Sequence, residues 1–239
     1  EQLTATATAS GDKLTLAGCK TFVLDATLAE MIVVSVNLNG SPRLIAVEKP
    51  QLPAAALSRE IVIDETRRSY QLRLDGISVR ADQLLPGADF NAIQNIAMLL
   101  LSAEMSGGIA GLLHVIVDYL TTRKQFDKLI GSYQALKHPT VQILLDGEAC
   151  RSHVYHAATM MDQGDLSAQQ IALHMAKAQA SEAFAFAGDR AIQFHGGFGF
   201  TWECNAQLFL RRALWCQYQF GDERYHRQKL APLLLDQVA

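Results

Sequence analysis

The spacing of apolar residues changes once along the chain, at Pro86-Gly87. Before this point apolar and polar residues alternate with the period of a half-buried β-strand, and after it long segments of helix-forming residues follow. The change predicts two domains, a partial β-domain over residues 1–87 and a helical domain over residues 88–239. The expected fold class is therefore α+β, with a partial antiparallel β-domain followed by an antiparallel four-helix-type bundle.

The first half is expected to form short strands. Residues 3–9 and 13–16 flank the turn Ser10-Gly11-Asp12 and predict an antiparallel hairpin. Further strands are expected over residues 31–38, 43–47, 61–63, 69–74 and 77–79. Because the chain begins with Glu1, inside an expected strand, we expect it to be a processed or partial piece of something longer.

The second half is expected to form five helices. The predicted segments are residues 90–123, 134–163, 167–194, 205–219 and 222–235. Glycines interrupt the pattern at Gly131, Gly164 and Gly196-Gly197, and Ser167 is a suitable N-cap for the third helix.

Composition excludes several classes of protein. The 239 residues are 49% hydrophobic and 19% charged, which is typical of a soluble globular chain. The net charge of −3 gives no indication of a nucleic-acid or anionic-membrane partner. A membrane span needs roughly 18 apolar residues, and the most apolar stretch, residues 96–103, ends at Glu104, so we expect no span. Four widely separated cysteines favour reduced thiols and a cytoplasmic location.

Familiar motifs for nucleotide and metal chemistry are absent. The Gly196 segment follows a helix and lacks the spacing of a Rossmann fingerprint, and no Walker A or G-x-S-x-G sequence occurs. A di-iron bundle needs two Glu-x-x-His pairs, and Glu223 with His226 is the single one. His153 and His156 share a helical face without further ligands nearby, so no metal site is expected.

Two segments combine cationic, amide and aromatic side chains with glycine. They are residues 123–134 and residues 191–201. An arginine can grip a pyrophosphate, glycine allows close backbone approach, and aromatic rings stack on planar groups, which together suggest a flat, phosphorylated cofactor. The alternative is structural: Arg123 stabilises a helix end, the glycines terminate a helix, and Phe126 and Phe198 belong to the core.

The order of these residues resembles a known family. R-K-Q-F-D-K-L-I-G-S-Y-Q-A-L-K-H over residues 123–138 and Q-F-H-G-G-F-G-F-T over residues 193–201 are similar to the C-terminal part of an acyl-CoA dehydrogenase, as are residues 208–212 and 220–227. Residues 72–85 resemble the exit of that family's middle β-domain, and Lys20-Thr21-Phe22 resembles a segment near its flavin.

The resemblance implies a flavoprotein of fatty acid or sterol degradation with a helical, a β- and a second helical domain, assembled as a homo- or hetero-oligomer (dimer or tetramer). Such enzymes oxidise the Cα–Cβ bond of an acyl-CoA: a carboxylate takes the α-proton and FAD takes the β-hydride. By the same resemblance, FAD contacts made across a subunit interface fall on Arg123, Gln125, Phe126, Ile130, Tyr133, Gln134, Gln193, Gly196 and Gly197.

The chain departs from the family at several positions. Asp127 and Leu24 replace a glycine and a hydroxyl residue, and the residues before Glu1 that would complete the flavin pocket are missing. The family's two positions for the catalytic base hold Phe220 and Ala97, neither of which can take a proton.

Glu104, two turns beyond Ala97, is a weak candidate for the base and is expected mainly to pair with an arginine. Three interpretations follow: a non-catalytic subunit completing an FAD site in a heteromer, an enzyme whose base comes from Glu104 or from the missing part, and a non-enzymatic assembly subunit. Neither the acyl group nor the electron acceptor is indicated by the sequence.

Overall fold

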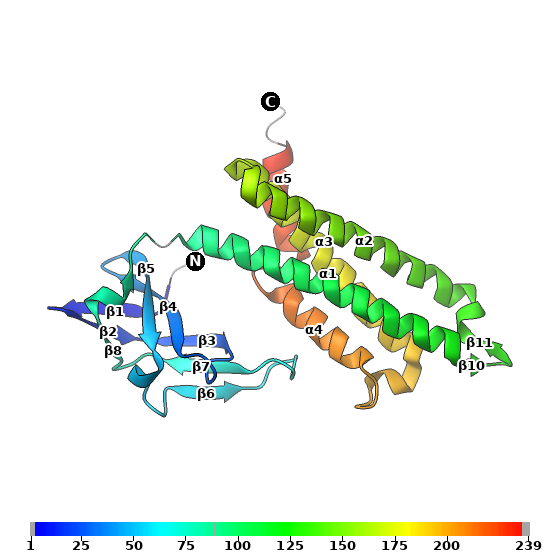
Figure 1. Cartoon of the computed structure of the whole chain (residues 1–239), viewed down its shortest axis with the longest axis horizontal. Helices are drawn as coiled ribbons and strands as arrows, with labels where there is room; N and C mark the ends of the chain where they lie inside the picture. Colours follow the sequence, from blue (N-terminus) through cyan, green and yellow to red (C-terminus); the bar gives the residue numbers. More distant parts are fainter. Residues whose placement is uncertain (1–2, 88, 236–239) are drawn as a thin grey trace. The chain divides into compact units, whose positions relative to one another are not determined.

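The computed structural model describes residues 3–87 and 89–235 and divides into two compact units (Figure 1). The first unit, Glu1–Phe90, is built of strands, and the second, Asn91–Ala239, of helices. The mixed α+β class predicted from the change in hydrophobic period is confirmed.

The strand unit contains two sheets. The larger has the order β8-β2-β1-β4-β5-β9, and the smaller has the order β3-β7-β6. The strand bounds are β1 Thr6–Ser10, β2 Lys13–Ala17, β3 Cys19–Leu24, β4 Met31–Leu38, β5 Ser41–Glu48, β6 Leu57–Glu60, β7 Ser69–Arg73, β8 Ser78–Arg80 and β9 Leu84–Leu85, with 3-10 turns η1 Lys49–Gln51 and η2 Ala81–Gln83. The predicted hairpin is present as β1 and β2, paired from Thr6–Ala17 to Ser10–Lys13.

The larger sheet is not purely antiparallel. β1 and β4 pair in parallel, with Thr6 opposite Asn37 and Ala7 opposite Leu38. The reason is that β3, which lies between β2 and β4 in the sequence, joins the smaller sheet, so the chain returns beside β1 in the same direction.

The strand predicted over residues 61–63 is wrong. β6 ends at Glu60, and Ile61 is 95% exposed. The carboxylate of Glu60 accepts hydrogen bonds from the Phe22 backbone N–H at 2.9 Å and from the Ser69 hydroxyl at 2.8 Å. These bonds fix the last pair of the β6–β7 ladder, Glu60 with Ser69, and the chain leaves the sheet after it.

All five predicted helices are present. They are α1 Phe90–Thr122, α2 Gln134–Gln163, α3 Leu166–His195, α4 Ala206–Tyr218 and α5 Glu223–Leu235. The expected N-cap of α3 is wrong: Asp165 caps the helix, its Oδ1 accepting the Ala168 N–H at 2.8 Å, because Ser167 already lies inside the helix.

Small residues let the helices approach closely. α3 packs against α2, α4 and α5, and it buries a stripe of alanines at Ala172, Ala176, Ala180, Ala183, Ala187 and Ala191. A methyl group on Gly108 of α1 would lie 2.4 Å from the ring of Phe184, and one on Gly188 would lie 3.0 Å from Leu210. The side chains that fill the bundle therefore rest directly on bare backbone.

α1 alone among the described residues is long and apolar enough to cross a membrane. Its most apolar 18-residue window has a mean hydropathy of 1.7, and one third of that window is buried. From the sequence we expected no membrane span, because Glu104 ends the most apolar stretch. The hydropathy of α1 does not support that exclusion. Met105, Ile109, Leu112 and Ile116 are buried at the spacing of one helical face, so part of this hydropathy is explained by packing within the bundle.

Candidate functional site

The segment after α1 folds into a small hairpin. β10 (Lys124–Gln125) and β11 (Lys128–Leu129) pair in antiparallel fashion around the two-residue loop Phe126-Asp127. Phe126 has φ 53° and Asp127 has φ 59°, the left-handed values that a two-residue hairpin loop of the common mirror-image type requires. Aspartate tolerates this conformation, which explains how Asp127 can stand where the family resemblance leads us to expect glycine.

Phe126 carries strain without burial. A bulky residue at positive φ is uncommon, and its side chain is 86% exposed. The alternative that placed Phe126 in the core is therefore wrong, and Phe198 at 43% exposure is not fully buried either. Strained residues that gain nothing from packing are concentrated at binding sites, so Phe126 is a candidate ligand contact.

Short-range hydrogen bonds hold the hairpin against the end of α1. The Ile130 N–H donates to the Arg123 carbonyl at 2.9 Å, and the Tyr133 hydroxyl donates to the Gln125 carbonyl at 3.2 Å. Gly131, in the turn η3 (Ile130–Ser132), passes so close that a methyl group there would lie 2.7 Å from the Leu120 carbonyl oxygen. The loop between α1 and α2 is thus fixed by hydrogen bonds among its own residues and by its close approach to α1.

α3 ends beside this hairpin in the turn η4 (Gly196–Phe200). Gly196 is the C-cap, with φ 61° and ψ −142°, a conformation that favours glycine, so the expected role of the glycines in ending the helix is confirmed for Gly196. The ring of His195 stacks on Tyr119 of α1 with centroids 4.2 Å apart. Its Nδ1 lies 2.7 Å from the Ala191 carbonyl, and since a carbonyl only accepts, Nδ1 carries the proton.

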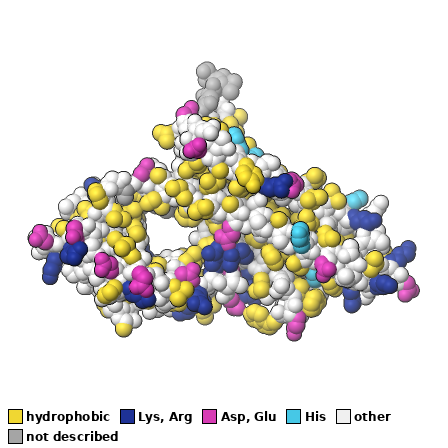
Figure 2. All heavy atoms as spheres, in the orientation of Figure 1, with side chains coloured by type: hydrophobic (Ala, Val, Ile, Leu, Met, Phe, Trp, Pro, Cys, Tyr) yellow, Lys and Arg dark blue, Asp and Glu magenta, His cyan; other side chains and the backbone are white. Residues whose placement is uncertain are grey.

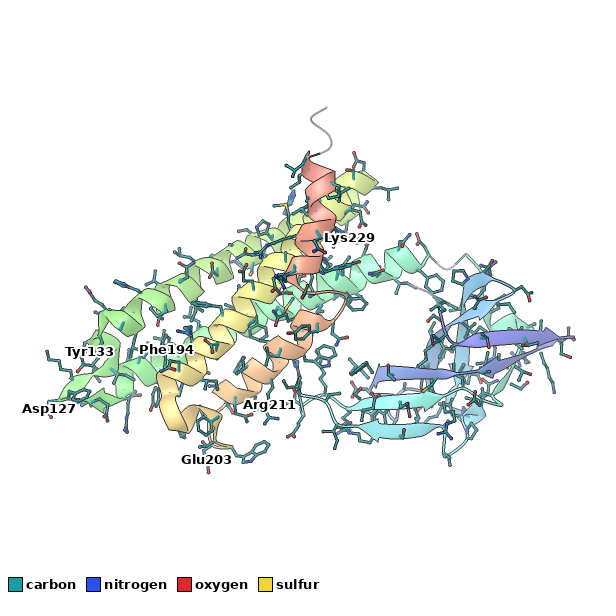
Figure 3. All side chains as sticks on the ribbon, turned by 180° about the vertical axis from the view of Figure 1, so that it is seen from behind. Asp127, Tyr133, Phe194, Glu203, Arg211 and Lys229 are labelled. Atoms are coloured by element: carbon teal, nitrogen blue, oxygen red, sulfur yellow. The ribbon has the colours of Figure 1, made fainter. Side chains whose placement is uncertain are left out.

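These pieces line one depression of about 360 Å³. Seven of the nine sequence-predicted cofactor residues contribute to its wall, namely Arg123, Gln125, Phe126, Ile130, Tyr133, Gln193 and Gly196. Gln134 and Gly197 are not part of the wall. Figure 3 shows Asp127, Tyr133 and Phe194 at this end of the helical unit, and Figure 2 shows Lys and Arg side chains gathered there.

Four wall residues were not identified from the sequence: Tyr119, Leu136, Phe194 and His195. Tyr119 lies one helical turn before Arg123. Leu136 lies within the family-like motif of residues 123–138 but outside the segment 123–134 whose chemistry suggested a cofactor. Helical spacing from Arg123 could have found Tyr119, whereas Phe194 and His195 were inside the motif and carried no distinguishing signal.

The wall of the depression has the chemistry of a site for a planar, phosphorylated group. It offers one guanidinium fork, the amides of Gln125 and Gln193, and the exposed ring of Phe126. Its volume lies at the lower end for ligand sites, so it suits part of a dinucleotide rather than the whole. The residues present therefore fit the adenosine diphosphate half of FAD.

The positions considered for a catalytic base hold Glu104 and Phe220, besides Ala97. Glu104 pairs with Arg212 of α4, and both side chains are about one third exposed, so the predicted arginine partner is present but less buried than expected. Phe220, which the family resemblance places at a base position, adopts φ 58° and is 44% exposed. No group of three or more His, Cys, Asp or Glu that could hold a metal occurs within residues 3–87 and 89–235.

Lys20 and Phe22 lie at an irregularity in the strand unit. The register of β3 against β7 shifts between Lys20 and Val23, and Phe22 has φ 56° with an exposed ring. The Lys20 ammonium donates to the Ser35 hydroxyl at 3.0 Å, and partial burial lowers its pKa. The bulge turns Phe22 outward from the sheet.

Comparison with known proteins gives consistent matches. The family described as "Acyl-CoA dehydrogenase, C-terminal domain" matches residues 94–235. The chain is 30% identical over 225 residues to acyl-CoA dehydrogenase FadE12 of Mycobacterium tuberculosis, covering 89% of this chain and 58% of that protein. The chain thus spans little more than half the length of this relative.

Solved structures share the fold over nearly the whole chain. A chain described as electron transferring flavoprotein of Acidaminococcus fermentans superposes with a TM-score of 0.87 at 27% identity, covering 97% of this chain and 63% of its own. The ChsE4-ChsE5 complex from Mycobacterium tuberculosis matches in fold with a TM-score of 0.89 at 22% identity, covering 100% of this chain and 64% of that one.

Proposed function

The chain belongs to the acyl-CoA dehydrogenase family, and from this premise we propose that it is a subunit of an FAD-dependent enzyme that introduces a Cα–Cβ double bond into an acyl-CoA thioester. The observation that carries the proposal is the convergence of Arg123, Gln125, Phe126 and Gln193 in one depression. FAD, when bound, would accept the hydride from the β-carbon.

Each wall residue has a specific task in this proposal. Arg123 offers paired N–H donors to the pyrophosphate, a contact that needs a planar fork. Gln125 and Gln193 supply amide groups, and the Phe126 ring offers a face on which a base can stack. Because the hairpin and the Gly196 cap are fixed by their own hydrogen bonds, the backbone that carries these groups is held in place before the ligand arrives.

The chain does not supply a catalytic base in this proposal. Ala97 and Phe220 stand at the two base positions that the resemblance indicates. The Glu104 carboxylate forms a salt bridge with Arg212. The base would come from a partner subunit or from a part of the protein outside this sequence. The ChsE4-ChsE5 neighbour is described as a complex of two differently named chains, which supports a heteromeric assembly here. A cytoplasmic location also remains our prediction.

A surface suited to assembly is present on the helices. Ile93, Ile96 and Leu100 form an exposed apolar stripe along α1, and Val141, Leu144 and Leu145 expose apolar side chains on α2. Figure 2 shows apolar side chains along these helices. Exposed apolar surface of this kind is typical of subunit interfaces, so we propose a homo- or hetero-oligomer, dimer or tetramer, with FAD bound near the interface.

The experiment is a titration of the full chain, alone and with a co-expressed partner, with FAD and with ADP. Arg123→Ala is expected to weaken both by about ten- to hundred-fold, because a charge-assisted contact of roughly 1.5–3 kcal/mol is lost. Arg123→Lys should recover part of the affinity, and Lys124→Ala, on the exposed side of the hairpin, is the matched control.

A non-enzymatic assembly subunit is the second candidate, favoured by the missing base. It predicts no flavin in the purified complex and equal ADP affinity in wild type and Arg123→Ala. A fall in melting temperature without a fall in ADP affinity would show that Arg123 only stabilises the end of α1 and would remove the flavin proposal.

A further inference from the structure

Lys177, in the middle of α3, is wholly buried. Its ammonium donates three hydrogen bonds: to the Ser181 hydroxyl at 2.9 Å, to the Gln217 carbonyl at 3.1 Å and to the Gly221 carbonyl at 2.8 Å. An ammonium has three N–H donors, so all of them are used. Burying a charged lysine is costly, and two of its three partners are backbone carbonyls at the end of α4 and in the α4–α5 connection.

That connection is held in an uncommon conformation. Phe220 has φ 58° and Gly221 has φ 104°, and a methyl group on Gly221 would lie 2.3 Å from the ring of Tyr225. Phe220 is 44% exposed, so burial of its ring does not offset the strained backbone. The two Lys177 bonds instead bracket the strained residue, with one acceptor before it and one directly after it. Strain that the surroundings impose in this way is concentrated at sites with a function.

The groups around Lys177 favour its charged form at neutral pH. Burial lowers its pKa to about 8, while Cys216 of α4 and Asp222 and Glu223 at the start of α5 act in the opposite direction. His226 of α5 faces the same region, and burial lowers its pKa to about 4, so it is neutral there. A neutral lysine keeps two N–H donors for the two carbonyls, and the Ser181 hydroxyl can donate to the amine nitrogen. Deprotonation therefore removes the positive charge that strengthens the bonds to the Gln217 and Gly221 carbonyls.

We propose that Lys177 is a positioning residue: by binding the carbonyls of Gln217 and Gly221 it holds Phe220 in its left-handed conformation, with the ring presented as an apolar contact for the acyl group of the thioester. The inference rests on the proposed function, in which Phe220 stands at a base position, and a base that takes the α-proton lies beside the acyl thioester. It adds that the apolar ring of Phe220 stands where a base is otherwise expected, and that buried Lys177 holds the backbone which carries this ring.

The first test follows the turn itself. In full-length protein labelled with ¹⁵N-glycine, the Gly221 amide resonance is expected to shift with pH, with a midpoint near the Lys177 pKa of about 8. Lys177→Met should shift the resonance at pH 6.5 and abolish the titration. Ser181→Ala removes only the third acceptor and should leave the Gly221 resonance nearly unchanged, and Lys137→Met, an exposed lysine of α2, is the matched control.

The second test measures function in the assembled complex. Hexanoyl-CoA and CoA are the probes, and the ratio of their dissociation constants reports contacts with the acyl group. Lys177→Met and Phe220→Ala are both expected to reduce the wild-type ratio, by roughly tenfold, while ADP affinity stays unchanged. A role confined to stability would lower the melting temperature without altering this ratio.

Three outcomes overturn the inference: a Gly221 resonance that Lys177→Met does not alter, a ratio that it does not alter, or equal binding of hexanoyl-CoA and CoA by the wild type. Should Lys177→Met fail to fold, two other measurements test the inference. They are the pH titration of the Gly221 resonance in the wild type and the ratio of dissociation constants in Phe220→Ala. If the wild type does not bind ADP, the result counts against the proposed function and not against the role of Lys177.

Discussion

The Nδ1 atoms of His174 on α3 and His226 on α5 lie 2.8 Å apart in the interior of the helical unit. One ring must donate its Nδ1–H while the other accepts, so the pair is compatible with two neutral imidazoles. The Nε2 of His226 is buried and has no hydrogen-bond partner among the described residues. Lys177 and Lys229 lie close enough to disfavour a further positive charge.

This pair predicts a loss of stability in acid. Burial lowers the pKa of His226 to about 4, and burial also lowers the pKa of His174. The unfolded chain, with ordinary histidine pKa values near 6.5, therefore binds more protons than the folded one. The free energy of unfolding should be highest above pH 6.5 and should fall as the pH decreases towards 4. For each histidine that stays neutral in the folded chain, the loss is about 1.4 kcal/mol per pH unit.

Thermal unfolding measured between pH 4 and 7.5 checks this prediction. His226→Gln should flatten the pH dependence, and His156→Gln, an exposed histidine of α2, should leave it unchanged. Equal slopes for wild type and His226→Gln would contradict the assignment.

The neighbouring glycines Gly107 and Gly108 should respond in opposite directions to alanine. Gly108→Ala places a methyl group 2.4 Å from the Phe184 ring, so we expect it to destabilise the protein by roughly 1–3 kcal/mol. Gly107 has nothing within 4 Å, and Gly107→Ala should stabilise α1 by roughly 0.5–1 kcal/mol. Urea unfolding of both variants gives the comparison, and a Gly108→Ala variant as stable as wild type would show that α1 and α3 pack less closely.

The hairpin loop offers a test of its left-handed backbone. Asp127 has φ 59°, so Asp127→Gly should relieve strain and stabilise the protein by up to about 1 kcal/mol. Asp118→Gly, in the regular part of α1, should instead destabilise the protein by about the same amount. Opposite shifts in melting temperature are expected. Destabilisation by both changes would mean that the Asp127 side chain, rather than its backbone, holds the loop.

The exposed stripe on α1 predicts self-association or binding of a partner subunit. Leu100, the last residue of that stripe, is 64% exposed. Leu100→Glu would place a charge in an apolar interface and should shift the protein towards monomers in sedimentation velocity at micromolar concentration. Leu166→Glu, another exposed leucine on a different helix, is the control. A wild type that sediments as a monomer, alone and with its co-expressed partner, would contradict the proposed interface.

Local features of the sequence determined the helical unit well. The bounds of α2 agree with the prediction to the residue, and those of the other four helices agree within one residue, because glycine and polar breaks stop a helix locally. The same locality explains the candidate site. Residues 123–134 are contiguous, so a hairpin and a turn were enough to bring Arg123, Gln125 and Tyr133 to one wall.

Gln134 shows the limit of that reasoning. It follows Tyr133 directly, yet it is the first residue of α2, where successive side chains are rotated by about 100°. Adjacency in a motif therefore did not determine which side chains face the depression. In the strand unit the parallel pairing of β1 and β4 could not be predicted either. The alternation of apolar and polar residues specifies a strand but not the strand beside it.

Tertiary structure alone determined the contacts between residues that lie far apart in the chain. The sequence shows His174, Lys177, His226 and Phe220 as separate residues of two helices and a turn. The fold joins His174 to His226 across 52 positions and Lys177 to Gly221 across 44. Hydrophobic period and helix signals act over a few residues, whereas the burial that shifts these pKa values and the bonds that hold Phe220 exist only when α3, α4 and α5 are packed together.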